Sequence, residues 1–371
     1  MIRLENLTKH FGSASNPFVA VDNVSLDLPS GEICVLLGPS GCGKTTTMKM
    51  INRLIQPTSG KVFIDGKDTS TVDLIELRRS IGYVVQQIGL FPNKTIEDNI
   101  CIVPDLLGWD RRKSRVRAKE LLDLVGLHPD LYLKRYPKEL SGGQQQRVGV
   151  LRALAADPPV MLMDEPFGAI DPINRETIQE EFLKMQQEIR KTIIFVSHDL
   201  DEAVKMADKI AIFRGGKLEQ YAAPDDLLAR PANSFIEDFL GSDRALKRLR
   251  LVNVSAAMET GFVTVSPSSS VEEALREMRA MRSIAAFVLA PDGAPQFLLS
   301  DEMAAGRSGT VGDHMVPVKG SVRMGNDLRQ AVSLMFAHDM PLLPCVDENG
   351  RMAGVVSYRS IVSNLGHGEN G

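Results

Sequence analysis

Residues 38–45 read Gly38-Pro39-Ser40-Gly41-Cys42-Gly43-Lys44-Thr45. This run matches the pattern G-x-x-x-x-G-K-[ST], whose glycines let the backbone curl so that successive N–H groups face a phosphate. The apolar run from Glu32 to Leu37 precedes it, and helix-forming residues from Thr45 to Leu54 follow it. A strand, a glycine-rich turn and a helix in this order predict a phosphate-binding loop, because a helix N-terminus attracts anions.

The side chains of this loop predict a nucleotide site that uses Mg²⁺. Lys44 is expected to reach the β- and γ-phosphates, and the Thr45 hydroxyl is expected to hold Mg²⁺. Cys42 occupies a variable position of the motif, so its thiol is given no role of its own. The nucleotide-binding set in this segment comprises Gly38, Ser40, Gly41, Cys42, Gly43, Lys44, Thr45 and Thr46.

A pair of carboxylates follows a second apolar run. Val160-Met161-Leu162-Met163 leads directly into Asp164 and Glu165. Apolar strands often end in an acid, so this pattern gains its meaning from the phosphate loop that precedes it. In that context Asp164 is predicted to bind Mg²⁺, and Glu165 is predicted to polarise the attacking water.

Residues 140–144 predict a second anion site. They read Leu140-Ser141-Gly142-Gly143-Gln144, in which Ser141 and Gln144 have the spacing of a capping box that begins a helix. The two glycines leave the N–H groups of the first turn uncovered. One chain has no evident use for two phosphate sites on one nucleotide, so the segment is expected to close over ATP held by another copy. An ordinary capped helix is the alternative.

Composition and length restrict the class of protein. The chain has 371 residues, enough for two or three domains, with 43% hydrophobic and 24% charged residues. No apolar run approaches the roughly 18 residues that span a bilayer, and no secretion signal is visible. Four scattered cysteines predict a reduced, cytosolic protein without structural zinc. The net charge of −4 gives no indication of nucleic-acid binding.

The chain is expected to contain an α/β domain at residues 1–241, a basic linker at 242–251, and two repeats at 252–310 and 311–367. Residues near 95–157 are rich in helix formers and predict a helical insert. The repeats are offset by 57 residues, with helices expected at Val271–Met281 and Leu328–His338. They are expected to pack on each other. The repeat aligns Met258 with Met315, Ala274 with Ala331, Met278 with Met335, Gly293 with Gly350, and Ser300 with Ser357.

The segment Ser141-Gly142-Gly143-Gln144, placed between the phosphate loop and Asp164-Glu165, resembles the signature of the ABC transporter ATPase family. The resemblance covers residues 1 to about 240. It implies a P-loop NTPase cassette of the α/β class with a helical subdomain. It also implies ATP and Mg²⁺ as ligands, and a head-to-tail homodimer that buries two nucleotides.

The same resemblance assigns four further residues. Phe11 corresponds to an aromatic that stacks on adenine, with a core phenylalanine as the alternative. Gln86 corresponds to a glutamine that contacts Mg²⁺ or water and faces membrane subunits, although Gln87 competes for that role. Asp171 corresponds to the loop that crosses to the other subunit, with Gly168 and Ile170 where Ser and Leu are usual. His198 corresponds to the switch histidine at the γ-phosphate, with an ordinary strand-end histidine as the alternative.

The C-terminal repeats resemble a tandem pair of CBS domains, small regulatory α+β modules. The second copy carries the clearer pattern, Leu342-Leu343-Pro344-Cys345-Val346-Asp347 and Gly354-Val355-Val356-Ser357. Many CBS pairs contact ribose through a Ser or Thr and an Asp three residues later. Here Ser357 is followed by Ser360, and Ser300 by Met303, so the usual ribose contact is not expected.

An ABC ATPase with a CBS pair is similar to the ATPases of importers for glycine betaine, choline or carnitine. This similarity implies two integral-membrane permease subunits, an extracytoplasmic substrate-binding protein and a place on the cytoplasmic face of the membrane. The position of the CBS pair after the linker and its lack of catalytic constellations lead to the hypothesis that it senses ionic strength or a cyclic dinucleotide, with a structural role in dimerisation as the alternative. The alternatives are an importer for another small solute, a CBS-type binding module without transport, and a soluble ABC protein acting on ribosomes or DNA.

Overall fold

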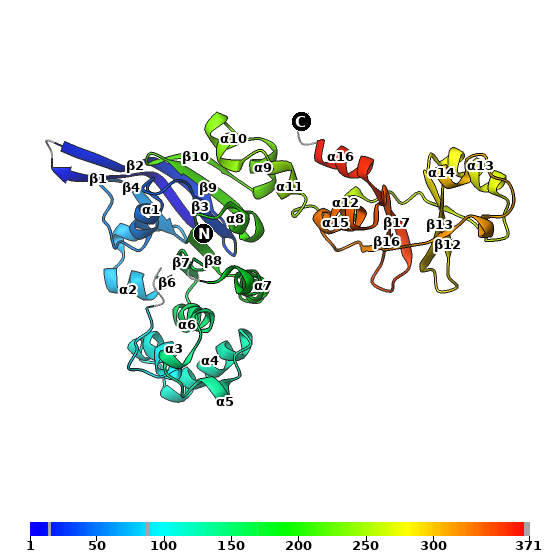
Figure 1. The fold of residues 1–371 in the computed structure, drawn as a ribbon. Coiled ribbons are helices and arrows are strands. Elements are labelled where there is room, and N and C mark those ends of the chain that lie inside the picture. Colours follow the sequence, from blue (N-terminus) through cyan, green and yellow to red (C-terminus); the bar gives the residue numbers. More distant parts are fainter. Residues whose placement is uncertain (14–15, 86–88, 169, 367–371) are drawn as a thin grey trace. The chain divides into compact units, whose positions relative to one another are not determined.

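The computed structural model describes residues 1–13, 16–85, 89–168 and 170–366. These residues form two compact units (Figure 1). The first unit contains Met1–Leu227 and Pro231–Leu240, and the second contains Leu228–Arg230 and Gly241–Gly371. In the described residues, no helix combines the length and the apolar character needed to cross a membrane.

A largely parallel sheet forms the centre of the first unit. Its strand order is β10-β9-β3-β8-β7-β6, with only β10 antiparallel to its neighbour. Strands β3, β7 and β8 are buried along their whole length, as expected for apolar, partly β-branched runs in a parallel sheet. The strands are β3 (Ile33–Leu37), β6 (Ile81–Val84), β7 (Val160–Asp164), β8 (Thr192–Val196), β9 (Lys209–Arg214) and β10 (Lys217–Ala222).

An antiparallel sheet in the order β2-β1-β4-β5 accompanies the parallel one. Its inner residues, among them Ile2, Leu4 and Val24, share one apolar core with Leu36 of β3 and Met48 of α1. This packing fixes the hairpin of β1 and β2 against the helix that follows the phosphate loop. The strands are β1 (Ile2–Ser13), β2 (Asn16–Leu28), β4 (Ser59–Ile64) and β5 (Lys67–Asp68).

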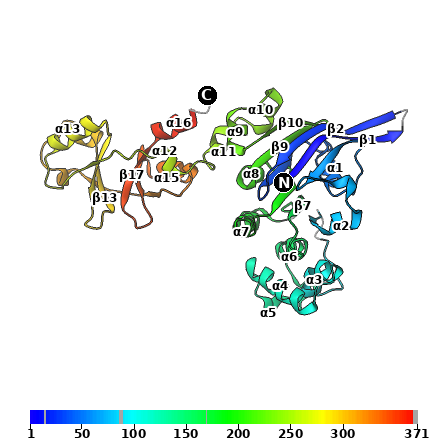
Figure 2. The ribbon, with the colours of Figure 1, turned by 180° about the vertical axis from the view of Figure 1, so that it is seen from behind.

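The expected helical insert is confirmed, since helices α3 to α6 lie between β6 and β7 in sequence. Figures 1 and 2 show α3, α4 and α5 at the end of the first unit that is farthest from the β1–β2 hairpin. The helices that lie wholly in this unit are α1 (Lys44–Ile51), α2 (Leu74–Arg79), α3 (Ile96–Leu106), α4 (Arg111–Leu124), α5 (Pro129–Tyr132), α6 (Gly142–Leu154), α7 (Pro172–Ile189), α8 (Leu200–Met206) and α10 (Ser234–Leu240), with 3₁₀ turns at Thr69–Thr71 and Pro137–Glu139. Helix α9 (Pro224–Ala229) begins in this unit and ends in the second one.

The second unit contains the two repeats, whose main helices α13 (Val271–Met281) and α15 (Leu328–His338) have the predicted bounds. One sheet has the order β11-β12-β13-β14 and the other β15-β16-β17. The strands are β11 (Val263–Thr264), β12 (Ala285–Leu289), β13 (Pro295–Ser300), β14 (Val316–Pro317), β15 (Val322–Arg323), β16 (Leu342–Val346) and β17 (Met352–Ser357). The remaining helices are α11 (Arg244–Arg248), α12 (Val254–Ala257), α14 (Asp301–Ala304), α16 (Tyr358–Gly366) and the 3₁₀ turn Val311–Asp313.

The repeats exchange their leading segments. Strand β14 follows the first repeat in sequence but pairs with β13, so that Leu298 lies opposite Val316. In the same way Glu259 forms a bridge with Val355 of β17 in the second repeat. The segment before each repeat therefore completes the sheet of the other one, and the two repeats form a single folded unit.

Candidate nucleotide-binding and catalytic site

Three strands bring the predicted residues to one edge of the parallel sheet. In the register of the sheet, Val196 of β8 lies beside both Leu36 of β3 and Asp164 of β7. The phosphate loop follows β3, Glu165 follows β7, and His198 follows β8 within two residues. Since the carboxyl ends of parallel strands meet at one edge, these segments lie at the edge where open α/β sheets bind ligands.

Two glycines shape the phosphate loop. Gly38 has a φ of 139°, and a Cβ atom there would lie 2.2 Å from the carbonyl oxygen of Phe213. Gly43 has a φ of 104°, and its Cβ atom would lie 2.5 Å from the carbonyl oxygen of Ala20. Both positions therefore require glycine for backbone conformation and for space. The resulting turn directs the N-terminus of α1 toward the backbone of the phosphate loop.

Lys44 is held by the loop that surrounds it. Its Nζ atom donates to the carbonyl oxygens of Gly38 at 2.7 Å and Pro39 at 2.9 Å, and lies 3.7 Å from the Cys42 sulfur. Thr46 lies half-buried in the first turn of α1. The ammonium group is thus placed at the mouth of the loop, where an anion can replace carbonyl oxygens as its partner.

Thr45 and Asp164 provide a pair of oxygen ligands suited to Mg²⁺. The Thr45 hydroxyl donates to Asp164 Oδ1 at 3.2 Å. Asp164 is 9% exposed, and burial raises the pKa of its carboxyl above the ordinary value, while the Thr45 hydrogen bond acts in the opposite direction. Burial disfavours the ionised form of this carboxyl group, whereas a divalent cation bound beside it favours the ionised form. Hard oxygen donors at this edge therefore fit Mg²⁺.

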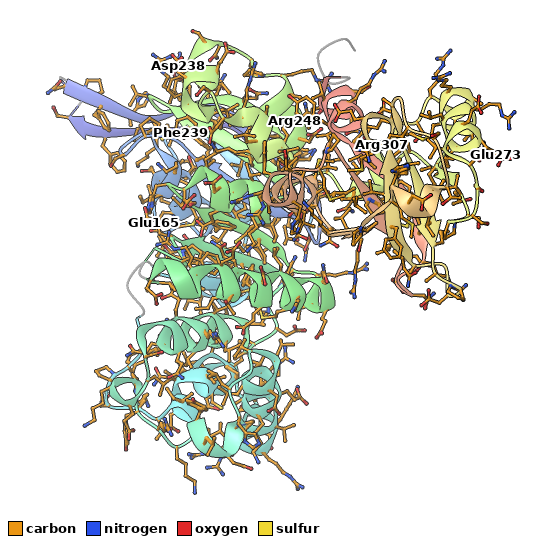
Figure 3. The ribbon with its side chains drawn as sticks, turned by 45° about the vertical axis from the view of Figure 1, so that its right-hand side comes forward. Glu165, Asp238, Phe239, Arg248, Glu273 and Arg307 are labelled. Carbon is orange, nitrogen blue, oxygen red and sulfur yellow. The ribbon has the colours of Figure 1, made fainter. Side chains whose placement is uncertain are left out.

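Glu165 and His198 face each other across the edge. His198 Nδ1 lies 3.7 Å from Glu165 Oε1, and the His198 side chain is 64% exposed. Glu165, labelled in Figure 3, has a φ of 48°, a left-handed conformation that costs a residue with a Cβ roughly 1–2 kcal/mol. Its N–H donates to the Val196 carbonyl oxygen at 3.0 Å, which holds that conformation. Local strain of this kind is common at functional sites.

Phe11 lies on the β1–β2 hairpin and is not a core residue. Its side chain is 40% exposed, opposite Phe18 in the hairpin register, with Lys9 Nζ 5.0 Å from the ring centroid. The core alternative is therefore wrong. An exposed aromatic ring on this hairpin is available for stacking on a base.

Ser141 begins helix α6 as the capping box predicts. Its Oγ accepts a hydrogen bond from the Gln144 N–H at 3.3 Å, and its N–H donates to Gln144 Oε1 at 3.0 Å. A Cβ atom on Gly142 would meet nothing within 4 Å, whereas one on Gly143 would lie 3.1 Å from Ile178 Cδ1. The uncovered helix end thus has open space beside Gly142, as an anion-binding role requires.

The remaining predicted residues divide into two cases. Asp171 is exposed immediately before α7, and its carbonyl oxygen accepts the Arg175 N–H at 3.0 Å. Gln86 and its competitor Gln87 lie outside the described residues, so both assignments stay predictions.

In the second unit, both serines of the CBS pattern act as helix caps. Ser300 Oγ accepts the Met303 N–H at 3.2 Å, and Ser357 Oγ accepts the Ser360 N–H at 3.1 Å. A cavity of about 610 Å³ lies between the two repeats and is lined in part by Lys319 and His338.

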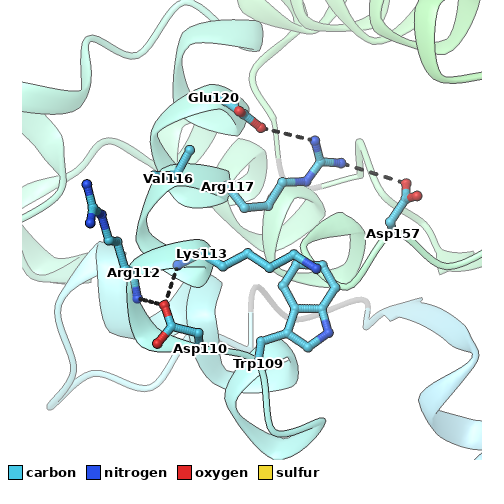
Figure 4. Close-up of a pocket in the computed structure, with 8 residues that line it drawn as sticks. All are labelled: Trp109, Asp110, Arg112, Lys113, Val116, Arg117, Glu120 and Asp157. Atoms are coloured by element: carbon cyan, nitrogen blue, oxygen red, sulfur yellow. Dashed lines mark hydrogen bonds and ion pairs between the residues drawn. The ribbon is translucent and has the colours of Figure 1, made fainter.

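A hollow of about 600 Å³ on helix α4 contains none of the predicted residues (Figure 4). Arg117 forms ion pairs with Glu120 at 3.5 Å and Asp157 at 3.7 Å, and Lys113 Nζ lies 3.9 Å from the centroid of the Trp109 ring. Its charges are therefore largely matched within the hollow. Its lining consists of Trp109, Asp110, Arg112, Lys113, Val116, Arg117, Glu120 and Asp157.

Sequence reasoning missed a group of polar side chains behind His198. Glu202 is 7% exposed and hydrogen-bonds to Ser197, and Arg175 forms an ion pair with Asp199 at 3.6 Å. One signal was present, because Asp199 and Glu202 have the spacing of a helix cap, and Asp199 Oδ1 does accept the Glu202 N–H at 3.1 Å.

Comparison with known proteins agrees with this geometry. The ABC transporter family model matches residues 21–168, and the CBS domain model matches residues 254–295 and 311–367. The osmoprotectant import ATP-binding protein OsmV of Salmonella typhimurium is 52% identical over 370 residues, covering 99% of this chain and 97% of the relative. The glycine betaine/carnitine/choline transport ATP-binding protein OpuCA of Bacillus subtilis is 46% identical over 366 residues, covering 98% and 95%.

Solved structures resemble the first unit. The dimeric bacterial ABC transporter cassette MJ0796 is 36% identical with a TM-score of 0.54, covering 60% of this chain and 99% of that one. The dimeric post-hydrolysis state of the same cassette, bound to ADP and Pi, is 35% identical with a TM-score of 0.54 and the same coverage.

Proposed function

The chain belongs to the ABC transporter ATPase family and carries two CBS domains, and we propose that it powers the import of quaternary-ammonium osmoprotectants such as glycine betaine, choline or carnitine. One observation carries the ATPase assignment. The phosphate loop, the Asp164–Glu165 pair and His198 meet at the carboxyl edge of one parallel sheet.

The residues at this edge divide the work of ATP hydrolysis. The loop N–H groups and Lys44 bind the phosphates, and the exposed ring of Phe11 stacks on the base. Thr45 and Asp164 would hold Mg²⁺, which would neutralise charge on the phosphate oxygens. Glu165 orients the attacking water and accepts its proton, and His198 contacts the γ-phosphate. The 3.7 Å distance between His198 Nδ1 and Glu165 Oε1 supports a shared role of the two side chains at one reacting group.

The proposed active unit is a head-to-tail homodimer that buries two molecules of ATP. The open end of α6 at Ser141 has no phosphate partner of its own in this scheme, because the phosphate loop already holds the nucleotide. In the symmetric dimer this helix end does have a phosphate partner, because each copy contributes its helix end to the ATP bound by the other copy. ATP binding favours the closed dimer, and loss of the γ-phosphate contact lets it open.

Glu165→Gln tests the catalytic assignment. The variant should bind ATP normally while its turnover falls at least about a hundredfold, because the amide cannot accept the proton of water. Glu188→Gln, an exposed position on α7, is the matched control and should leave turnover unchanged. Wild-type turnover in Glu165→Gln would contradict the role of Glu165.

A groove of about 430 Å³ supports the proposed contact with permease subunits. It is lined by Val85 and Gly89, which flank residues 86–88, and by apolar residues such as Val103. Arg79 and Arg152 also line it, and burial lowers the pKa of the Arg152 guanidinium. An apolar floor with one partly buried cation, Arg152, and one exposed cation, Arg79, suits a short helix that carries apolar and acidic side chains.

The exposed Arg79 allows the permease contact to be tested by charge reversal. Arg79→Glu should reduce co-purification of the chain with membrane subunits from detergent-solubilised membranes. Arg112→Glu on α4, outside the groove, is the control. If the two variants co-purified with membrane subunits in equal amounts, the groove would not be the permease contact.

The solute is tested by uptake in cells that lack this chain. Uptake of labelled glycine betaine, choline and carnitine at high osmolarity should return with the wild-type chain and not with Glu165→Gln. An extracytoplasmic binding protein is expected to deliver the solute. Rescue of uptake of an unrelated solute alone would favour an importer of another class.

We propose that the CBS pair regulates this activity by sensing ionic strength or a cyclic dinucleotide. The cavity between the repeats supports a ligand of nucleotide size, and Lys319 provides a cation for a phosphate. A chain ending after residue 245 should lose the dependence of transport on salt or on the dinucleotide. Unchanged dependence would leave the pair with a purely structural role.

A further inference from the structure

Helix α7, helix α8 and the turn after β8 are joined by a polar network directly behind His198. We propose that Glu202 is a positioning residue that fixes the turn carrying His198, and that Arg175 ties the same turn to the segment before α7. The inference rests on the proposed role of His198 at the γ-phosphate.

Glu202 is a buried carboxyl group with two specific partners. Its Oε2 atom accepts a hydrogen bond from the Ser197 hydroxyl, and its Oε1 atom accepts one from Gln179 Nε2 at 3.1 Å. The three side chains are 7%, 1% and 5% exposed, respectively. Burial raises the pKa of Glu202, and both hydrogen bonds act in the opposite direction. A buried acid is costly without such partners, so the carboxyl group is confined to one geometry.

The turn around His198 is held on both sides, whereas the imidazole itself projects outward. The Ser197 N–H donates to the Leu36 carbonyl oxygen at 3.1 Å, just before the phosphate loop, and Ser197 Oγ accepts the Asp199 N–H at 3.0 Å. His198 stands between these two anchored residues. The backbone of the turn therefore determines where the imidazole lies, and Glu202 restrains that turn through Ser197.

Arg175 extends the network toward the loop proposed to meet the second copy. Its Nη2 atom donates to the Ile170 carbonyl oxygen at 3.0 Å, and its Nη1 atom lies 3.6 Å from Asp199 Oδ2. Ile170 immediately precedes Asp171 in the chain. A displacement of this segment on dimer closure is thus transmitted through one guanidinium group to the residue beside His198.

A purely structural polar cluster would predict a different outcome from a positioning role. If the cluster only stabilises the fold, removing Glu202 lowers the unfolding temperature and leaves kcat per folded molecule unchanged. If it positions His198, removing Glu202 lowers kcat by a larger factor than it raises the KM for ATP, because the γ-phosphate contact of the imidazole is proposed to strengthen in the transition state.

The test is a double-mutant cycle on the full-length chain with His198→Ala. Glu202→Ala alone should lower kcat about tenfold with KM within about twofold, a fraction of what a general acid–base group contributes. In the His198→Ala background, Glu202→Ala should lower kcat no further, because two residues that act as one unit are not additive. Arg175→Met is expected to follow Glu202→Ala: it should lower kcat when His198 is present and lower it no further in the His198→Ala background.

Conservative and matched variants separate positioning from stability. Glu202→Gln keeps the shape, one acceptor oxygen for Gln179 and an amide N–H that can donate to Ser197 Oγ, and should keep kcat within about threefold of wild type. Gln179→Met should lower kcat even if Glu202→Ala fails to fold. Gln186→Met is its control, since Gln186 is also buried on α7, 7% exposed, but hydrogen-bonds to the carbonyl oxygens of Gly31 and Lys191. It should lower stability with kcat unchanged.

The outcomes distinguish this inference from the proposed function. If Glu202→Ala lowered kcat by the same factor with and without His198, the positioning role would be overturned while the ATPase assignment would stay intact. Equal effects of Gln179→Met and Gln186→Met on kcat would also overturn it. A His198→Ala variant with wild-type turnover would contradict the proposed role of His198 itself, and this inference with it.

Discussion

The Thr45 hydroxyl donates a hydrogen bond to Asp164 Oδ1 at 3.2 Å, although the two residues are 119 positions apart in the chain. The contact joins the start of α1 to the end of β7, across the intervening strand β8. It brings the hydroxyl of the phosphate loop and the buried carboxylate close enough together to bind one cation.

Asp164→Asn should weaken binding of ATP at least about tenfold in the presence of Mg²⁺ and change it little in the presence of EDTA. The amide still accepts the Thr45 hydrogen bond but brings no charge to the cation. Nucleotide titration followed by calorimetry measures both constants. Asp238→Asn, on an exposed position of α10, is the control (Figure 3). Equal weakening with and without Mg²⁺ would contradict a metal role.

Gly43→Ala should abolish ATP binding and lower the free energy of unfolding by about 3 kcal/mol. The new Cβ atom would lie 2.5 Å from the Ala20 carbonyl oxygen, at a φ of 104°. Gly66→Ala also introduces a side chain at positive φ, 78°, but into open space, and should cost only about 1 kcal/mol with normal ATP binding. Urea unfolding and nucleotide titration compare the two variants. Similar losses in both would rule out the steric account of the loop.

Ser141→Ala should lower stability by about 1 kcal/mol, because the Gln144 N–H loses its cap. It should also reduce ATPase activity at least about tenfold, since the capped helix end is proposed to bind the nucleotide of the second copy. Ser270→Ala removes the corresponding cap of α13, whose Oγ accepts the Glu273 N–H at 3.2 Å. This control should lose similar stability with full activity. Equal activities of the two variants would argue for an ordinary capped helix.

Arg248→Met should destabilise the second unit by about 1–3 kcal/mol. Arg248 is buried, and its Nη1 atom donates to the Leu365 carbonyl oxygen at 2.8 Å. Arg250→Met, at a half-buried position in the same basic segment, is the control and should cost less. Thermal unfolding of the full-length variants measures the difference. A larger effect of Arg250→Met would contradict an anchoring role for Arg248.

The features predicted from sequence are those fixed by short-range pattern. The phosphate loop, the capping box at Ser141 and the bounds of α13 and α15 each depend on residues within about ten positions of one another. Backbone conformation and hydrophobic period decide such features locally. The meeting of Asp164, Glu165 and His198 followed from a general property of parallel sheets.

Other features depended on contacts between distant residues. Nothing in the local sequence of Glu202 indicates that Gln179, on another helix, donates to its carboxyl group. The 57-residue repeat likewise gives the order of strands but not their partners, so the pairing of Val316 with Leu298 became evident only in the folded unit. The role of Gln86 stays a prediction, since it lies outside the described residues.

The proposed mechanism depends most directly on one nucleotide being shared by two copies of the chain. Sedimentation of the full-length Glu165→Gln variant with ATP and Mg²⁺ measures this. We expect a dimer that forms with ATP, returns to monomer when ATP is removed, and is lost when Ser141→Glu is added, because the new carboxylate repels the phosphate. A chain that stays monomeric at saturating ATP, or a dimer indifferent to both ATP and Ser141→Glu, would contradict it.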